Sequence, residues 1–261
     1  LGNLGNACAA LGDTRKAIEY HDQALVILRE IGDQRGEGNV LGNLGNAYAD
    51  LGDVRKAIEF YEQHRVIARE IGDRRGEGQA LGNMGSAYFV LGDVRKAIEF
   101  YEQRLVIARE IGDRRGEGAA LGNLGLAYYS FDARKAIEFY EQDLVIVREI
   151  GYRRGEGAAL GNMGNAYAAL GDARKAIEFY EQQLVIAREI GDRRGEGNAL
   201  WNSADEFYKL GQRDEAIGRG EAALKIYEQI EDPNAAKVRA KLAEWKGGGG
   251  NVKRGTRRAK R

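Results

Sequence analysis

Proline, cysteine and histidine are nearly absent from this sequence of 261 residues, which contains one Pro, one Cys and two His. Proline breaks helix interiors, so its near absence favours long helices. The single cysteine, Cys8, excludes an internal disulfide and is typical of a reducing compartment, so we expect a cytoplasmic protein. His21 and His64 belong to no cluster with metal-ligand spacing, and we interpret both as packing or surface residues. The sequence therefore predicts no metal site, no cofactor and no enzyme.

Long apolar runs are also lacking. No segment approaches the roughly 18 apolar residues that a membrane span needs, and the chain does not open with a signal peptide. Hydrophobic residues make up 43% of the chain and charged residues 31%, a balance typical of a folded, water-soluble protein. Because Leu1 falls within a repeat, we expect the chain to be part of a longer protein.

The net charge of zero conceals a basic C-terminal end. Residues 247–261 carry six of the 40 basic residues and no acidic one, so residues 1–246 have 34 basic and 40 acidic residues. A negative body argues against nucleic acid as the main partner. The acidic residues recur at helix-face positions, which indicates solvated faces rather than a catalytic carboxylate pair.

A repeat of about 40 residues dominates what is present. Residues 53–78 and 93–118 differ at only two of 26 positions, His64/Arg104 and Arg65/Leu105. Such a period is typical of helical repeats that stack into one continuous core. The opening leucines, at spacings of 40, 40, 40, 39 and 40 residues, are Leu1, Leu41, Leu81, Leu121, Leu160 and Leu200.

Each repeat is predicted to contain two antiparallel helices, which we name helix A and helix B. The Gly-Asp pairs at 72–73 and 92–93 are stop-and-start signals, since glycine ends a helix in the left-handed conformation and aspartate caps the next one. Helix A is therefore expected over about 74–91 and helix B over about 94–111. Helix B carries apolar residues on more than one face, as a helix buried on two sides must.

Glycines inside helix A are the exception to this pattern, because each costs ~0.8–1.0 kcal/mol relative to alanine. We interpret them as sites of close helix approach. A phosphate loop is excluded, because no Gly-Lys-Ser/Thr follows them and no strand precedes them. In one repeat they are Gly76, Gly78, Gly82 and Gly85.

The motif residues of the repeat resemble the signature of the tetratricopeptide repeat family. They stand as Leu81, Met84-Gly85, Tyr88, Ala97 and Tyr101, and again as Leu160, Met163-Gly164, Tyr167, Ala176 and Tyr180. The extended repeat, with its motifs Leu-Gly-Asn-Ala-Tyr and Gly-Asp-Arg-x-Gly-Glu-Gly, resembles the repeats of Pins-type spindle-orientation adaptors. It is also similar to bacterial and archaeal arrays attached to signalling NTPases. The resemblance covers 1–246 and implies an all-α, right-handed α-solenoid of about six helix-turn-helix repeats plus a C-terminal capping helix.

Several positions depart from the family pattern. Arg109 and Arg188 replace the usual closing proline, so helix B runs on and the period lengthens. Phe131 replaces a Leu-Gly pair in the 39-residue repeat, where we expect a distorted turn. The C-terminal motifs by which the animal adaptors bind G proteins are not recognisable. Polar residues replace a small one in helix B, which predicts looser or solvated contacts, at His64, Arg104, Asp143 and Gln183.

We therefore predict a repeat array over 1–231, a capping helix over 232–246 and a disordered basic tail over 247–261. Asp232 and Pro233 would be the N-cap and first residue of the capping helix. The N-terminal end has no cap, which makes it an expected site of self-association. The repeats are predicted at about 1–33, 34–73, 74–113, 114–152, 153–192 and 193–231.

The resemblance implies that A helices line the concave side of the array. Helical spacing places one stripe of each A helix opposite Leu81, Met84 and Tyr88, and we predict that this stripe is a binding groove. The groove candidates are Arg35, Asn39, Asn43, Asn46, Arg75, Gln79, Asn83, Ser86, Phe89, Arg115, Asn123, Leu126, Tyr129, Arg154, Asn162, Asn165, Arg194 and Asn202.

Asparagine and arginine recur along this stripe. A carboxamide complements an extended peptide backbone, and a guanidinium group favours carboxylates. Two alternatives stay open: the asparagines cap neighbouring helices, and the arginines form weak surface pairs with Glu77 and its equivalents. Phe89, Leu126 and Tyr129 would make the middle of the groove apolar. The expected partner is a protein or peptide, acidic with one apolar anchor, rather than a small-molecule substrate.

The leading hypothesis is a protein-interaction scaffold or adaptor that binds an extended peptide segment in the groove. The alternative is a regulatory or oligomerisation module of a larger signalling NTPase or protease-like protein. Nucleic-acid binding through the basic tail is the hypothesis that we favour least, and it predicts binding that falls steeply with salt.

Overall fold

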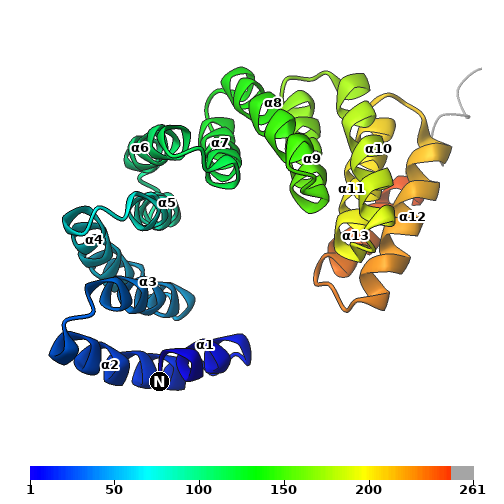
Figure 1. Ribbon diagram of the computed structural model, residues 1–261. Coiled ribbons are helices and arrows are strands. Elements are labelled where there is room, and N and C mark those ends of the chain that lie inside the picture. Colours follow the sequence, from blue (N-terminus) through cyan, green and yellow to red (C-terminus); the bar gives the residue numbers. More distant parts are fainter. Residues whose placement is uncertain (248–261) are drawn as a thin grey trace, which may run out of the picture. The chain divides into compact units, whose positions relative to one another are not determined.

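The computed structural model describes residues 1–247, and within that range the chain is all helical, with no strand (Figure 1). The prediction of an all-α helical-repeat fold is confirmed. The helices are α1 (Gly2–Ala10), α2 (Thr14–Ile31), α3 (Gln34–Asp50), α4 (Val54–Glu70), α5 (Arg74–Val90), α6 (Val94–Glu110), α7 (Arg114–Tyr129), α8 (Ala133–Glu149), α9 (Arg153–Ala169), α10 (Ala173–Glu189), α11 (Arg193–Lys209), α12 (Arg213–Gln229) and α13 (Asn234–Gly247).

The chain divides into two compact units, Leu1–Ser130 and Phe131–Arg261, which we call unit 1 and unit 2. In unit 1 the odd-numbered helices are A helices: α1 packs on α2, α3 on α4 and α5 on α6, and neighbouring A helices also contact one another. Figure 1 shows α3, α5 and α7 on the inside of unit 1 and α4 and α6 on its outside. Unit 2 repeats this arrangement, with α9 packed on α10, α11 packed on α12, and α9 in contact with α11. In each unit one face of the A helices therefore forms a continuous side.

The Gly-Asp pairs start and stop the helices as predicted. Gly72 has a φ of 71°, and the Asp73 side chain accepts a hydrogen bond from the Gly76 amide at 2.9 Å. The 39-residue repeat lacks such a pair: no residue from 129 to 132 has a positive φ, and Asp132 has a φ of −144° where Asp93 has −84°. The predicted distortion of this turn is present.

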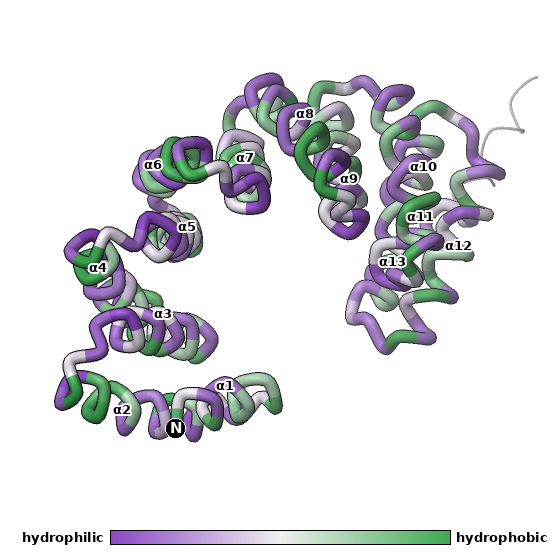
Figure 2. Tube along the Cα trace, viewed as in Figure 1, coloured by the Kyte–Doolittle hydropathy of each residue, from purple (hydrophilic) through white to green (hydrophobic). Residues whose placement is uncertain are grey.

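Polar and apolar residues are interspersed along each helix (Figure 2), and the apolar ones form the core between paired helices. Leu81 and Leu160 of the family motif are buried almost completely. The helix A glycines permit close approach, as predicted: a Cβ on Gly85 would lie 2.5 Å from the Tyr101 ring, and a Cβ on Gly164 would lie 2.5 Å from the Tyr180 ring. No described helix has the length and apolar character that crossing a membrane requires.

A buried glutamate of helix A forms an ion pair with an arginine of the preceding helix B. That arginine stands where the family signature has proline. Arg109, which stands at the proline position, donates from Nε to Oε1 of Glu117 at 2.8 Å, and Arg114 donates to the other carboxylate oxygen at 2.5 Å. Burial alone would raise the pKa of Glu117, but these two arginines outweigh it and lower the pKa. The expectation that the acidic residues are solvated was wrong here, because the helix-pairing geometry needs this carboxylate inside. Equivalent pairs are Arg69–Glu77, Arg148–Glu156 and Arg188–Glu196.

The last helix closes the core of unit 2. Val238, Leu242 and Trp245 of α13 are buried, and the Trp245 ring stacks on Tyr208 with 4.5 Å between ring centroids. Asp232 accepts a hydrogen bond from the Asn234 amide at 2.9 Å, so α13 begins at Asn234 and Pro233 precedes it. Gly247 belongs to α13, and the rest of the predicted disordered tail, 248–261, lies outside the described residues.

Candidate ligand-binding groove

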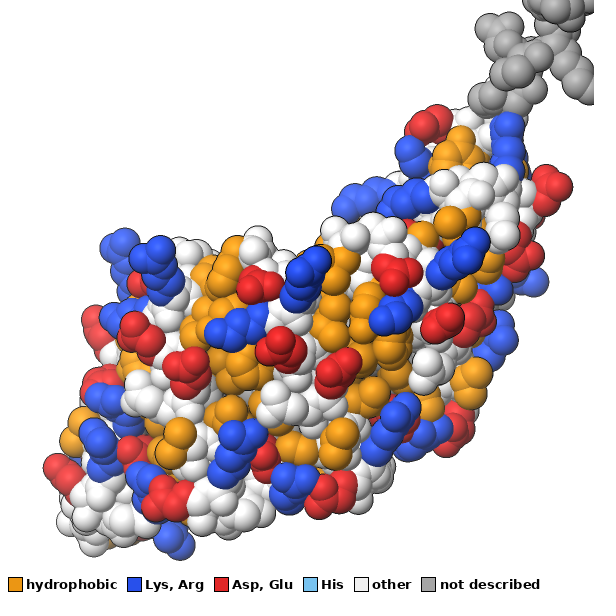
Figure 3. Space-filling view, turned by 90° about the horizontal axis from the view of Figure 1, so that it is seen from above, with side chains coloured by type: hydrophobic (Ala, Val, Ile, Leu, Met, Phe, Trp, Pro, Cys, Tyr) orange, Lys and Arg blue, Asp and Glu red, His pale blue; other side chains and the backbone are white. Residues whose placement is uncertain are grey.

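The predicted groove stripe lies on the accessible side of the A helices. None of its residues is buried, whereas Leu81 and Met84 on the opposite side of α5 are 1% and 3% exposed. The separation of the two faces therefore follows the helical spacing. Hydrophobic, basic and acidic side chains are interleaved on the face of the molecule seen in Figure 3.

Asparagines connect consecutive A helices in unit 1. Asn83 donates from Nδ2 to Oδ1 of Asn46 at 3.3 Å, and Asn43 donates to Asn6 at 3.0 Å. The oxygen of Asn46 also accepts from the Tyr61 hydroxyl of helix B at 2.9 Å. These asparagines therefore form a ladder, and the alternative that they cap neighbouring helices is wrong.

The same ladder recurs in unit 2. Asn202 donates to Asn165 at 3.3 Å, and Asn165 accepts from the Tyr180 hydroxyl at 2.8 Å. The ladder links neighbouring A helices, and it uses only part of each carboxamide. Asn202 therefore keeps an acceptor oxygen for other groups.

The ladder is interrupted where another residue replaces its acceptor asparagine. Ser86 stands at the position of Asn46, and its hydroxyl donates to the Gly82 carbonyl at 3.1 Å and accepts from Tyr101 at 3.2 Å. Among the residues that the structure describes, neither Asn123 nor Asn162 has a hydrogen-bond partner for its side chain. Their carboxamides have donors and acceptors free for a ligand.

The recurrent arginines pair with the N-cap aspartate of the next A helix. Arg75 lies 3.5 Å from Asp113, and Arg194 lies 2.8 Å from Asp232. The alternative that they pair with Glu77 and its equivalents is wrong, because the adjacent arginine of each repeat occupies those carboxylates. Arg35 pairs with Asp73 at 3.8 Å, and Arg115 lies at the corresponding exposed position of α7. Arg154 is exposed and forms no ion pair within 1–247.

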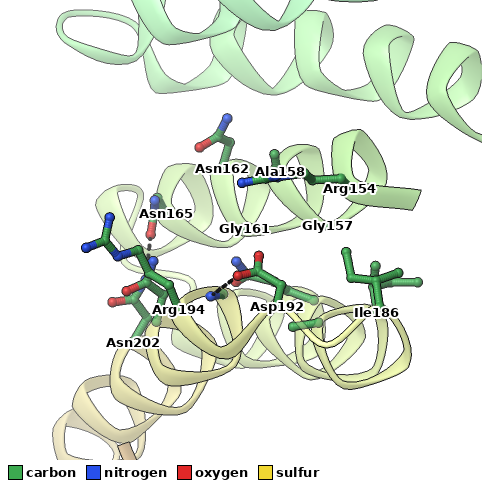
Figure 4. Close-up of a pocket in the computed structure, with 15 residues that line it drawn as sticks. Arg154, Gly157, Ala158, Gly161, Asn162, Asn165, Ile186, Asp192, Arg194 and Asn202 are labelled. Atoms are coloured by element: carbon green, nitrogen blue, oxygen red, sulfur yellow. Dashed lines mark hydrogen bonds between the residues drawn. The ribbon is translucent and has the colours of Figure 1, made fainter. Parts of the chain in front are cut away.

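Unit 2 contains a pocket of about 340 Å³ between α9 and α11 (Figure 4). Five predicted residues line it, with Arg154, Asn162 and Asn165 on α9 and Arg194 and Asn202 on α11. Its floor comes from helix B and from the helix A glycines: Gly157, Gly161, Gln183 and Ile186.

A smaller hollow of about 20 Å³ lies in unit 1 between α5, α6 and the start of α7. The predicted residues Arg75 and Gln79 line it together with Arg104, Ile107 and Asp113. Residues of the predicted stripe thus line a hollow in each unit.

Apolar side chains are present where the stripe continues along α5 and α7. Leu126 is 43% exposed and Tyr129 is 38% exposed, whereas Phe89 is partly buried. These three residues offer an accessible apolar surface in unit 1.

The helix B residues of the groove floor were missed by sequence reasoning. The prediction that contacts at this position are loose or solvated was wrong: His64 is 5% exposed and Asp143 is 8% exposed. Gln183 also lies on a glycine, since a Cβ on Gly161 would be 2.7 Å from its Nε2. The signal was present, because this position differs between repeats that are otherwise almost identical.

A family model described as tetratricopeptide repeat matches residues 1–70, 76–144 and 155–229, more than half of the sequence. Comparison with curated proteins gives no match. Among solved structures, a signal transduction ATPase with numerous domains (STAND) with a tetratricopeptide repeat sensor, from Pyrococcus horikoshii, has a TM-score of 0.84 at 20% identity. That match covers 96% of this chain and 39% of the STAND protein.

Two further structures are similar over most of their own length. A Rap protein in complex with competence and sporulation factor has a TM-score of 0.66 at 18% identity, covering 94% of this chain and 73% of that one. A putative kinesin light chain with nearly identical repeats, from Podosopora anserina, has a TM-score of 0.60 at 23% identity, covering 72% and 94%. At these identities the likeness shows a shared fold.

Proposed function

Because the chain belongs to the tetratricopeptide repeat family, we propose that it is a protein-interaction scaffold that binds an extended peptide segment along its A helices. Proteins of this family are interaction modules, and the Rap relative is a complex with a competence and sporulation factor. The proposal assigns the binding role to the groove rather than to the outer helices.

The pocket of unit 2 carries this proposal. Two residues of α9 line this pocket: Arg154, whose guanidinium group is unpaired, and Asn162, whose carboxamide has free donors and acceptors. A volume of about 340 Å³ admits whole side chains, and the exposed polar groups around it complement a peptide backbone. Arg154 favours a carboxylate, so the proposed ligand is acidic at this point.

Unit 1 offers its own surface for the apolar anchor of a ligand. Leu126 and Tyr129 present accessible apolar surface on α7, and aromatic and aliphatic anchors contribute most of the binding energy in many interfaces. A peptide that binds unit 1 would therefore carry one large apolar residue.

Selection of random 12-residue peptides on the whole chain tests this proposal, followed by measurement of Kd for the selected sequences. The double variant Arg154→Ala with Asn162→Ala should weaken binding at least tenfold, which corresponds to about 1.4 kcal/mol. The matched control is Arg174→Ala with Gln182→Ala, which removes the same kinds of groups from exposed positions of α10. Equal affinity of both double variants for every selected peptide would exclude this groove as the binding site.

The STAND structure favours a second proposal, namely that the chain is the sensor or regulatory part of a longer signalling NTPase. This chain covers 39% of the STAND protein, which is what a sensor segment of a longer protein would do. Sequencing the gene on both sides of the 261-residue segment tests it: an adjoining nucleotide-binding domain supports it, and a gene that encodes only the repeats contradicts it.

A further inference from the structure

One position of helix B changes its chemistry from repeat to repeat. In α4, α6 and α10 it lies on a glycine of helix A, and in α6 and α10 it lines the hollows described above. The other positions of α4, α6, α8 and α10 are almost the same. Its residues are Ala24, His64 and Arg104 in unit 1, and Asp143, Gln183 and Ala223 in unit 2.

Arg104 fills most of its segment of the groove. A Cβ on Gly82 would collide with the Arg104 guanidinium group and would lie 2.8 Å from its Cδ, so a larger residue at position 82 would force this side chain to shift. The hollow beside it has about 20 Å³ where the Gln183 pocket has about 340 Å³. The longer side chain thus accounts for part of the difference between the two segments.

The charge of Arg104 is not neutralised within residues 1–247, where its side chain forms neither an ion pair nor a hydrogen bond. The nearest acidic residue of the hollow, Asp113, is 3.5 Å from Arg75 instead. Burial lowers the pKa of Arg104, while the charge of Asp113 raises it. Partial burial of a guanidinium group without a carboxylate costs free energy, because the group loses part of its hydration and gains no ion pair in exchange.

We propose that Arg104 is a carboxylate subsite, which takes the side chain of an aspartate or glutamate residue of the bound peptide. A guanidinium group binds a carboxylate through two parallel hydrogen bonds, and the Arg104 side chain lines the hollow and is only partly buried. The proposal rests on the peptide-binding function and assigns the specificity of one groove segment to a helix B residue.

The subsite can be tested with two defined probes, acetyl-Glu-Glu-Glu-Glu-amide and its neutral counterpart acetyl-Gln-Gln-Gln-Gln-amide. NMR titration of the whole chain, observed at the Nε–Hε resonance of Arg104, gives the Kd of each peptide. The wild type should bind the glutamate peptide at least fivefold more tightly, and its binding should shift that resonance.

The chain provides matched variants for this experiment. Arg104→Gln installs the residue of the Gln183 repeat and should reduce the preference measured at the backbone amides of α5 and α6 to about one, while the amides around Arg154 keep theirs. Arg95→Gln makes the same change of charge at an exposed position of the same helix, α6, and should keep the preference. Gln183→Arg should increase the preference for the glutamate peptide measured at the backbone amides of α9 and α10, which keeps the test valid if Arg104→Gln does not fold.

Two outcomes would overturn the subsite: equal binding of both probes to the wild type, or equal loss of preference in Arg104→Gln and Arg95→Gln. Either could occur while the Arg154 and Asn162 variants still lose their selected peptides, so its failure is distinguishable from that of the groove.

Discussion

A carboxyl group, Asp143, lies buried at the position where neighbouring repeats carry Arg104 and Gln183. Burial raises its pKa to about 7, from 3.8 for an exposed aspartate. Between these two pH values the folded chain binds more protons than the unfolded chain. Stability therefore falls as pH rises through this interval and levels off above pH 7.

Replacing Asp143 with asparagine should remove this pH dependence. We expect Asp143→Asn to have little effect on the free energy of unfolding at pH 4 and to increase it by a few kcal/mol at pH 8. Urea denaturation at the two pH values measures the change. Glu141→Gln is the control, because Glu141 is an exposed acid on the same helix, and a similar gain at pH 8 in both variants would contradict the assignment.

At the residue scale, helical spacing predicted which side chains are accessible but not which partners they choose. Asn83 and Arg75 lie on the predicted face, yet Asn83 binds another asparagine and Arg75 an N-cap aspartate. These partners come from the next helix pair, and their distances depend on the rise between stacked repeats. The sequence contains no measure of that rise, so the ladder and its gaps at Asn123 and Asn162 became visible only in three dimensions.

At the element scale, glycines inside helices allow the effect of packing to be distinguished from the effect of helix propensity. Gly164 and Gly218 both lie inside helices of unit 2, but only Gly164 faces a ring, that of Tyr180. A Cβ on Gly218 would meet nothing within 4 Å. Identical substitutions should therefore have opposite effects.

Gly218→Ala should stabilise unit 2 by about 0.8–1.0 kcal/mol, the difference in helix propensity. Gly164→Ala should destabilise it by about 1–3 kcal/mol, because the added methyl group forces the Tyr180 ring to move. Thermal unfolding followed by circular dichroism gives both values. If Gly164→Ala raises the melting temperature as much as Gly218→Ala, the close approach of α9 and α10 is not rigid.

Helix boundaries were the most predictable feature at this scale. Gly-Asp signals placed α5 and α6 within one residue of the expected ends, because capping is a local interaction that the sequence contains in full. The Arg109–Glu117 pair was not predicted, since its two residues belong to different helices and only the packing of those helices buries the Glu117 carboxylate.

At the scale of the whole molecule, both tryptophans report on one end of the chain. Trp201 and Trp245, the only two in the sequence, stack with 5.4 Å between ring centroids in α11 and α13. Fluorescence thus follows the C-terminal end, whereas circular dichroism follows all helices. In a repeat protein, stability is a sum of terms between neighbouring repeats, so the two signals need not change together.

In the variant Trp245→Ala, the fluorescence and circular dichroism transitions should no longer coincide. Loss of this buried ring should destabilise the C-terminal end by about 3–5 kcal/mol, so Trp201 fluorescence should change at a lower urea concentration than the circular dichroism signal. Lys237→Ala, at an exposed position of α13, should leave both transitions in place. Coincident transitions in Trp245→Ala would show that α13 is not an independent closing element.

The 40-residue period predicted the stacked helical architecture, but the division into unit 1 and unit 2 was not foreseen. The single array over 1–231 stays a prediction. The boundary between the units falls at Ser130 and Phe131, where the repeat is one residue short. A missing residue is easy to read in a sequence, whereas its effect on stacking depends on how the shortened turn directs the chain.

The near identity of residues 53–78 and 93–118 makes two junctions of unit 1 interchangeable. Excision of residues 74–113 would join Asp73 to Arg114, and Arg69 would then meet Glu117 in place of Glu77 without any new type of contact. Such a shortened chain would keep the contacts between neighbouring repeats but would lose Arg104. Along the chain, the His64 repeat would then be followed directly by the Asp143 repeat. Loss or gain of a whole repeat can therefore change which ligand groups are recognised while the core contacts between repeats stay the same.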